Sequence, residues 1–147
     1  MRLLLLLTGL ALTSSALALE YRALKDNAIL YDAPSIKGVK YFIIARGTPV
    51  EIVLTQNDWI KVRDSSGNMA WVGAGAISSL RTVLVRVDKA EVRTVADDKS
   101  AIIFSAEKNV VLELVDTAPP GWAKVNHRDA QGSELSGYVK ASQVWGL

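Results

Sequence analysis

The sequence contains no cysteine and only one histidine, His127, in 147 residues. The absence of cysteine excludes disulfides, a thiolate nucleophile and a thioether-linked lipid. A zinc site needs about three or four ligands, for which one histidine is poor material. A Ser-His-Asp triad would have to use His127, which lies in the polar stretch NHRDAQGSE and which we expect to be a solvated loop residue. We therefore expect no metal site and no catalytic residue of these classes.

Glycine-rich phosphate-binding and dinucleotide-binding motifs are also missing, so the sequence predicts no cofactor. The adjacent carboxylates Asp97 and Asp98 lie in a predicted turn, where such acids are usually only solvated. A non-catalytic protein is the favoured interpretation, and an enzyme with an unusual carboxylate site is the least favoured one.

Charge of one sign is not in excess, because 17 basic and 15 acidic residues give a net charge of +2. Nucleic-acid binding requires basic residues gathered on one face, whereas here they are scattered among acidic ones. We expect no nucleic-acid partner.

A long apolar run occurs only at the N-terminus. Arg2 is followed by the apolar stretch LLLLLTGLAL and then by the small-x-small triplet that ends at Ala18. This pattern predicts a signal peptide over residues 1–18, with an N-terminal anchor or a buried helix as the alternative. The run is shorter than the roughly 20 residues that span a bilayer, and no later stretch is longer, so we expect no membrane span in the mature chain.

The same features bear on location. Small domains exported by eukaryotes usually depend on disulfides, and the chain has neither cysteine nor an Asn-x-Ser/Thr acceptor. We therefore expect a periplasmic or extracellular protein of a bacterium.

The rest of the chain contains an internal repeat. Laying Ala28 on Ala90 keeps one register through the first half of each copy, and after short insertions the second halves agree again. We therefore predict two units, residues 19–80 and 81–147. The matched pairs include Phe42 with Phe104, Gly47 with Asn109, Trp59 with Trp122, Lys61 with Lys124 and Trp71 with Tyr138.

Each copy is made of short strand-like runs. AILY, KYFII, VEIVL, WIKVR and MAWV are rich in β-branched and aromatic residues and are bounded by turn formers. Gly47 and Asn109 are residue types that accept a left-handed backbone, which favours tight turns there. About five short strands per copy predict a small antiparallel barrel that closes its sheet and so hides its edges.

The segments AILYDAPS, GTPVEIV, DWIKVRD, GNMAWV and AGAIS resemble the bacterial Src homology 3 (SH3b) family, although Ala70 stands where that family more often has glycine. The resemblance covers nearly the whole mature chain and implies an all-β fold of two tandem SH3-like antiparallel barrels. Residues 78–89, which join the copies, lack glycine and proline and alternate like a strand, so we expect the barrels to be fixed relative to each other; a partly ordered linker is the alternative.

Strand alternation separates the side chains of WIKVR. Ile60 and Val62 share the core face, which leaves Trp59 and Lys61 on the wetter face, and Trp122 is placed in the same way. Trp59 either meets a ligand there or packs as a lid on the first loop. Trp71, between small and branched apolar residues, is expected in the core or at the barrel rim.

The resemblance extends to eukaryotic relatives, in which a tryptophan at the start of this strand and a tyrosine of the first loop line a peptide groove. It thereby implies a groove at Trp59 and Tyr31. Arg93 stands in place of Tyr31 in the second copy, so the second groove would be altered or lost. Trp145 is expected to pack the last turn or the interface between copies. The predicted ligand-binding residues are Tyr31, Asp32, Trp59, Lys61 and Trp122.

These observations favour a non-catalytic exported binding module that recognises peptidoglycan or an extended peptide, since the bacterial proteins that the chain resembles bind such material. The alternative is a structural adaptor of the cell envelope that binds another protein and has no affinity for the cell wall.

Overall fold

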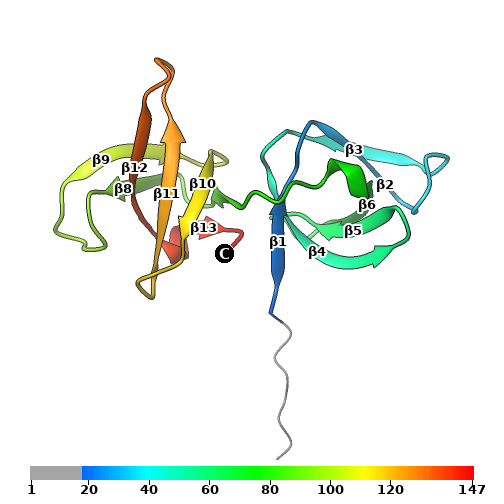
Figure 1. Ribbon diagram of the computed structural model, residues 1–147, viewed down its shortest axis with the longest axis horizontal. Helices are drawn as coiled ribbons and strands as arrows, with labels where there is room; N and C mark the ends of the chain where they lie inside the picture. Colours follow the sequence, from blue (N-terminus) through cyan, green and yellow to red (C-terminus); the bar gives the residue numbers. More distant parts are fainter. Residues whose placement is uncertain (1–17) are drawn as a thin grey trace, which may run out of the picture.

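The computed structural model describes residues 18–147, so the predicted signal peptide lies outside the described residues except for its last residue, Ala18. The described chain forms two antiparallel sheets that lie side by side, each from one half of the sequence (Figure 1). The predicted all-β architecture of two tandem units is confirmed. No helix within residues 18–147 is long and apolar enough to cross a membrane.

The first sheet has the strand order β1-β4-β5-β6-β2-β3, and the second has the order β13-β7-β10-β11-β12-β8-β9. A short 3-10 turn precedes the last segment of each copy, at Ala74–Ala76 and at Ala141–Gln143. The strands are β1 Glu20–Ala23, β2 Ala28–Tyr31, β3 Lys40–Ile44, β4 Pro49–Gln56, β5 Trp59–Arg63, β6 Met69–Gly73, β7 Thr82–Val85, β8 Lys89–Arg93, β9 Ile102–Glu107, β10 Val111–Asp116, β11 Trp122–Arg128, β12 Glu134–Lys140 and β13 Val144–Trp145.

Corresponding strands of the two copies pair in corresponding registers. Leu30 lies opposite Phe42 in the first copy, and Val92 lies opposite Phe104 in the second, with a bulge one residue later in each. The predicted left-handed turns are also present, since φ is 81° at Gly47 and 69° at Asn109. The internal repeat is therefore a repeat of structure as well as of sequence.

The prediction that each sheet closes on itself is wrong in detail, because β3 and β9 are end strands with one unpaired edge. The reason is visible at β1, whose outer edge is occupied by the segment that follows β6. Ala23 donates a backbone hydrogen bond to Leu80 and accepts one from Ser78, and Leu24 bridges Ile77. Residues 76–80 thus take the hydrogen-bond positions at the C-terminal end of β1 that a closing strand would need. Side-chain packing rather than a continuous hydrogen-bond ladder completes each core.

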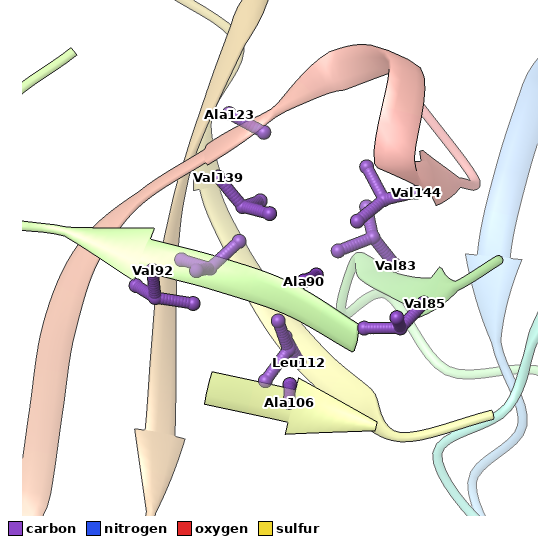
Figure 2. Close-up of a cluster of buried hydrophobic side chains, with 10 residues drawn as sticks. Val83, Val85, Ala90, Val92, Ala106, Leu112, Ala123, Val139 and Val144 are labelled. Atoms are coloured by element: carbon purple, nitrogen blue, oxygen red, sulfur yellow. The ribbon is translucent and has the colours of Figure 1, made fainter. Parts of the chain in front are cut away.

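Each copy has its own apolar core, made by the alternate residues of its strands. In the first copy the core includes Leu30, Val50, Val62 and Val72, all at most 1% exposed. Figure 2 shows the core of the second copy, where Leu112 lies beside Ala106 and the valines of β7, β8, β12 and β13 complete the cluster. Each unit thus contains a core of mostly small branched residues, as its strand sequences predict.

The join between the copies is structured. Residues 78–80 pair with β1 of the first copy, and β7 pairs with β10 and β13 of the second. The copies also touch directly: the rings of Tyr21 and Trp145 meet edge to face with centroids 5.1 Å apart, and the Thr82 hydroxyl donates to the Gly47 carbonyl at 2.7 Å. Trp145 therefore packs the interface between copies, one of its two predicted places, and these contacts join the two copies directly.

Candidate functional site

Three strands of the first copy bring aromatic side chains together on the side of the sheet away from the core. In the β5–β6 hairpin Trp71 lies opposite Lys61 and Gly73 lies opposite Trp59, and β2 adds Tyr31 opposite Trp71. Cross-strand neighbours share one face of a sheet. We call Tyr31, Trp59, Lys61 and Trp71 the aromatic face.

Tyr31 and Trp59 form the open part of this face. Their rings are perpendicular, at 89°, with centroids 5.4 Å apart, and both side chains are half-buried. Beside Trp59, a Cβ atom added at Gly73 would meet no heavy atom within 4 Å. The glycine thus leaves space next to the indole, and Trp59 offers part of its surface to solvent while Tyr31 holds its orientation.

Trp71 is buried, as the sequence predicts, but on the side of the sheet away from the core cluster. It is 8% exposed, yet it does not belong to the core cluster of its copy. The Lys61 ammonium lies 5.9 Å from the centroid of its ring, within the range of a cation–π contact. Trp71 therefore lies beneath Lys61, with Tyr31 opposite it on the neighbouring strand. The pairing register of the β5–β6 hairpin predicts this position, because a residue that lies opposite Lys61 must share its face of the sheet.

Of the charged residues near the aromatic face, Asp32 and Arg63 are already bonded to other residues of the first copy, whereas Lys61 can bind a ligand. Asp32 shapes the first loop, because its carboxylate accepts a 2.7 Å hydrogen bond from the backbone N–H of Val39 and its Oδ1 would lie 2.7 Å from a Cβ at Gly38. Arg63 pairs with Glu51 at 3.1 Å. Lys61 forms no ion pair among residues 18–147, so it is the cation of this face that remains available to a ligand.

The matching face of the second copy is charged. Arg93 lies opposite Tyr138 as Tyr31 lies opposite Trp71, and it donates to the carbonyl of Ser100 at 2.7 Å and to Glu91. Lys140 lies opposite Trp122 and pairs with Asp98 at 2.7 Å. Trp122 therefore lies in the second copy, apart from the other predicted ligand-binding residues. Arg93 occupies the position that Tyr31 has in the first copy. The expected alteration of the second groove follows from Arg93 and its partners.

The residues considered for catalysis, His127, Asp97 and Asp98, each contact a neighbouring residue of the second copy. His127 lies in β11 rather than in a loop, half-buried, with its ring centroid 5.4 Å from that of Phe104, so its expected place in a solvated loop is wrong. The first three residues of the polar stretch belong to β11, which continues through Arg128, and the hairpin turn follows them. Asp97 accepts the backbone N–H of Lys99, and Asp98 is paired with Lys140. Within residues 18–147 no three His, Cys, Asp or Glu side chains are grouped to hold a metal ion.

Two pKa shifts mark the interface between copies rather than the aromatic face. Burial, followed by the nearby Glu51 carboxylate, raises the pKa of the Tyr21 hydroxyl above 10.0. Burial also lowers the pKa of Arg81, whose Nη2 donates to the Gly146 carbonyl at 2.8 Å. Both side chains contact residues of the last strand and C-terminus, so they contribute to the contact between the two copies.

Two tandem antiparallel sheets, each wrapped around its own small core, define a pair of small all-β modules of the SH3 type. A family model described as "Bacterial SH3 domain" matches the chain twice, at residues 24–79 and 86–146. The chain belongs to the bacterial SH3 domain family, in two tandem copies. None of the curated proteins compared with the chain matches it.

Similar solved structures include NlpC2 and NlpC1 from Trichomonas vaginalis and an NlpC/P60 endopeptidase from Photobacterium damselae subsp. piscicida. Their sequence identities to this chain are 15%, 14% and 16%, and their TM-scores are 0.40, 0.39 and 0.37. The matches cover 89%, 92% and 86% of this chain but only 49%, 50% and 33% of the solved chains. The chain thus spans half or less of the length of these proteins.

Proposed function

We propose that the chain is a non-catalytic exported module, periplasmic or extracellular, that binds peptidoglycan or an extended peptide through the aromatic face of its first copy. We take residues 1–18 as its signal peptide and residues 19–80 and 81–147 as its two units. Membership of the bacterial SH3 domain family supports a binding role in the cell envelope. The observation that carries the proposal is the pairing of a partly exposed Trp59 with Tyr31 beside the open space at Gly73.

The chemistry of the face suits an extended peptide. Two aromatic rings provide apolar area with little loss of side-chain entropy, and Lys61 provides a cation for a ligand carboxylate. The ring of Trp71 below Lys61 keeps the ammonium near the face. Peptide stems of peptidoglycan contain both carboxylates and apolar methyl groups, so they match this combination. Asp32 contributes by fixing the loop that borders Tyr31.

The role of the second copy follows from its contacts. Its matching face contains Trp122, but ion pairs of Arg93 and Lys140 occupy the positions around it. We propose that Trp122 adds a weaker contact with a ligand of different chemistry and that the first copy provides most of the affinity.

Co-sedimentation with purified sacculi tests the proposal. The wild-type protein should pellet with sacculi, and Trp59→Ala should remain in the supernatant while keeping its circular dichroism spectrum. Tyr41→Ala is the matched control, because Tyr41 is a 56% exposed aromatic side chain of the same copy that lies on β3, outside the aromatic face. A wild-type protein that stays entirely in the supernatant contradicts cell-wall binding.

The second candidate is an adaptor that binds an envelope protein without affinity for the cell wall. The observation that favours it is the unpaired edge of β3, on which Tyr41 and Ile43 are 56% and 69% exposed. Exposed apolar side chains on a free edge are typical of surfaces that pair with another chain. A protein that ignores sacculi but captures one envelope protein, with the capture lost in Ile43→Lys, would identify this function.

A further inference from the structure

A hollow lies at the junction of the two copies, away from the residues of the aromatic face. It has a volume of about 220 Å³ and is lined by three segments. Ser65 and Ser66 come from the β5–β6 turn of the first copy, Arg86 follows β7, and Lys108 and Asn109 come from the β9–β10 turn of the second copy. We call this hollow the junction cavity.

The charged lining of the junction cavity has one sign. Arg86 and Lys108 are its two charged residues, and neither forms an ion pair within the part of the chain that the structure describes. Asp64, the acid next to the serines, is turned into its own hairpin, where its carboxylate accepts the backbone N–H groups of Ser66 and Asn68 at 2.9 Å. Two cations that line one hollow and form no direct ion pair favour an anion there.

Three of the five uncharged lining residues have side chains that can donate hydrogen bonds, and the other two, Leu84 and Val85, are apolar. Ser65 and Ser66 have hydroxyl groups, and Asn109 has a side-chain amide, all of which can donate to oxyanions. Hydrogen bonds from such groups and from Arg or Lys to a charged oxygen are among the stronger ones in proteins. The volume leaves room for a small anionic group together with its waters.

The cavity is built from turns that the fold holds in place. The backbone N–H of Asn109 donates to Val85 at 2.9 Å, and that of Arg86 donates to Gln143 at 2.9 Å. Asn109 has the left-handed φ of 69° that the turn requires. Because the Tyr21–Trp145 and Thr82–Gly47 contacts fix the first copy against the second, the serines keep their distance from the two cations.

From this combination we propose that the junction cavity is an anion site, which binds a phosphate or carboxylate group of a ligand lying across the two copies. The site goes beyond the peptide-binding face, since it shares no residue with it. It needs both copies, and it gives the tandem arrangement a function that one copy alone does not have.

Titration of the purified protein with sodium phosphate, followed by amide NMR at constant ionic strength, tests this proposal. We expect saturable shifts confined to the amides of Ser65, Ser66, Arg86, Lys108 and Asn109. Sodium acetate in a parallel titration distinguishes the two sources: saturation by acetate as well as phosphate indicates a carboxylate site, and saturation by phosphate alone indicates a phosphate site. Shifts that are linear with concentration or spread over the surface, for both anions, overturn the proposal.

Charge-removing variants give the second readout. The double variant Arg86→Gln, Lys108→Gln should bind phosphate at least about tenfold more weakly, because two charge-assisted contacts are lost. Lys37→Gln, Lys99→Gln is the matched control, since it removes the same charge from exposed loop positions outside the cavity. Equal affinity in both double variants overturns the proposal. If the Arg86, Lys108 variant does not fold, the shift map of the wild-type protein still decides, and Trp59→Ala, which affects only the proposed peptide site, should bind phosphate normally.

Discussion

Tyr31 stands perpendicular to Trp59, with the two ring centroids 5.4 Å apart on the outer side of the first sheet. Edge-to-face aromatic pairs stabilise each other by about 0.5–1.5 kcal/mol beyond the area they bury. Tyr31 therefore holds the indole of Trp59 in one orientation and contributes a ring of its own. The proposed binding function depends on this pair, whereas the second copy, with Arg93 at the matching position, has a different face.

Tyr31→Ala should weaken binding to soluble peptidoglycan fragments by about tenfold, because it removes one aromatic contact and frees Trp59 to move. Tyr31→Phe retains the ring and should stay within about twofold of the wild-type affinity. Intrinsic fluorescence titration measures both dissociation constants. Equal affinity of Tyr31→Ala and the wild-type protein would show that the pair is only a packing contact.

Gly137→Ala should destabilise the second copy by about 1–3 kcal/mol, because a Cβ there would lie 2.6 Å from the Arg93 carbonyl oxygen and 2.8 Å from a methyl carbon of Val92. Urea denaturation measures the free energy of unfolding. Gly75→Ala is the matched control, since a Cβ at that position meets no atom within 4 Å, and its free energy of unfolding should be close to that of the wild-type protein. A wild-type stability for Gly137→Ala would contradict the close approach of β12 to β8.

Gly146→Ala should loosen the contact between the copies. The residue has a φ of 112°, and an added Cβ would lie 2.8 Å from the Thr82 carbonyl and 3.1 Å from Cβ of Pro49 in the other copy. We expect a loss of about 1–3 kcal/mol and a broader distribution of shapes in small-angle X-ray scattering, because β13 can no longer seat against the first copy. An unchanged scattering profile would mean that the join alone fixes the two units.

Tyr21 makes stability depend on pH in the alkaline range. Its pKa is raised above 10.0 in the folded protein, first by burial and then by Glu51. A raised pKa means that the folded state binds the proton more tightly than the unfolded state, so this stabilisation is complete below pH 10.0 and is lost as the pH rises through the folded pKa. Tyr21→Phe, which keeps the ring beside Trp145, should show a smaller decrease in the free energy of unfolding above pH 10.0. Identical pH profiles for the two proteins would contradict this role of Tyr21.

Much of the fold follows from local sequence. Short β-branched runs and the internal repeat predict two all-β units, and residue type alone predicts the left-handed turns at Gly47 and Asn109. Sheet closure was predicted wrongly, because it depends on which segment takes the free edge of β1. That competition is decided by residues 76–80, far from β1 in the chain, so no local pattern reveals it.

The aromatic face was only partly predictable. Alternation places Trp59 and Lys61 away from the core, and the neighbours Ala70 and Val72 predict the buried position that Trp71 has, but not the face of the sheet on which it lies. Its true place follows from the hairpin register, which the turn hydrogen bond from the Asp64 N–H to the Asn68 carbonyl fixes. The structural role of Asp32 depends on the approach of Gly38 across the first loop, which is a tertiary contact.

The most direct test of the account uses the four tryptophans as separate probes. Each indole N–H gives its own NMR signal, and soluble muropeptides released from sacculi are the ligand. The account predicts that the Trp59 signal shifts most and saturates, that Trp71 beneath Lys61 shifts less, that Trp122 shifts weakly, and that Trp145, packed against Tyr21, stays unchanged. A spectrum in which Trp59 does not move at saturating muropeptide, or in which Trp122 moves in its place, would contradict binding by the first copy.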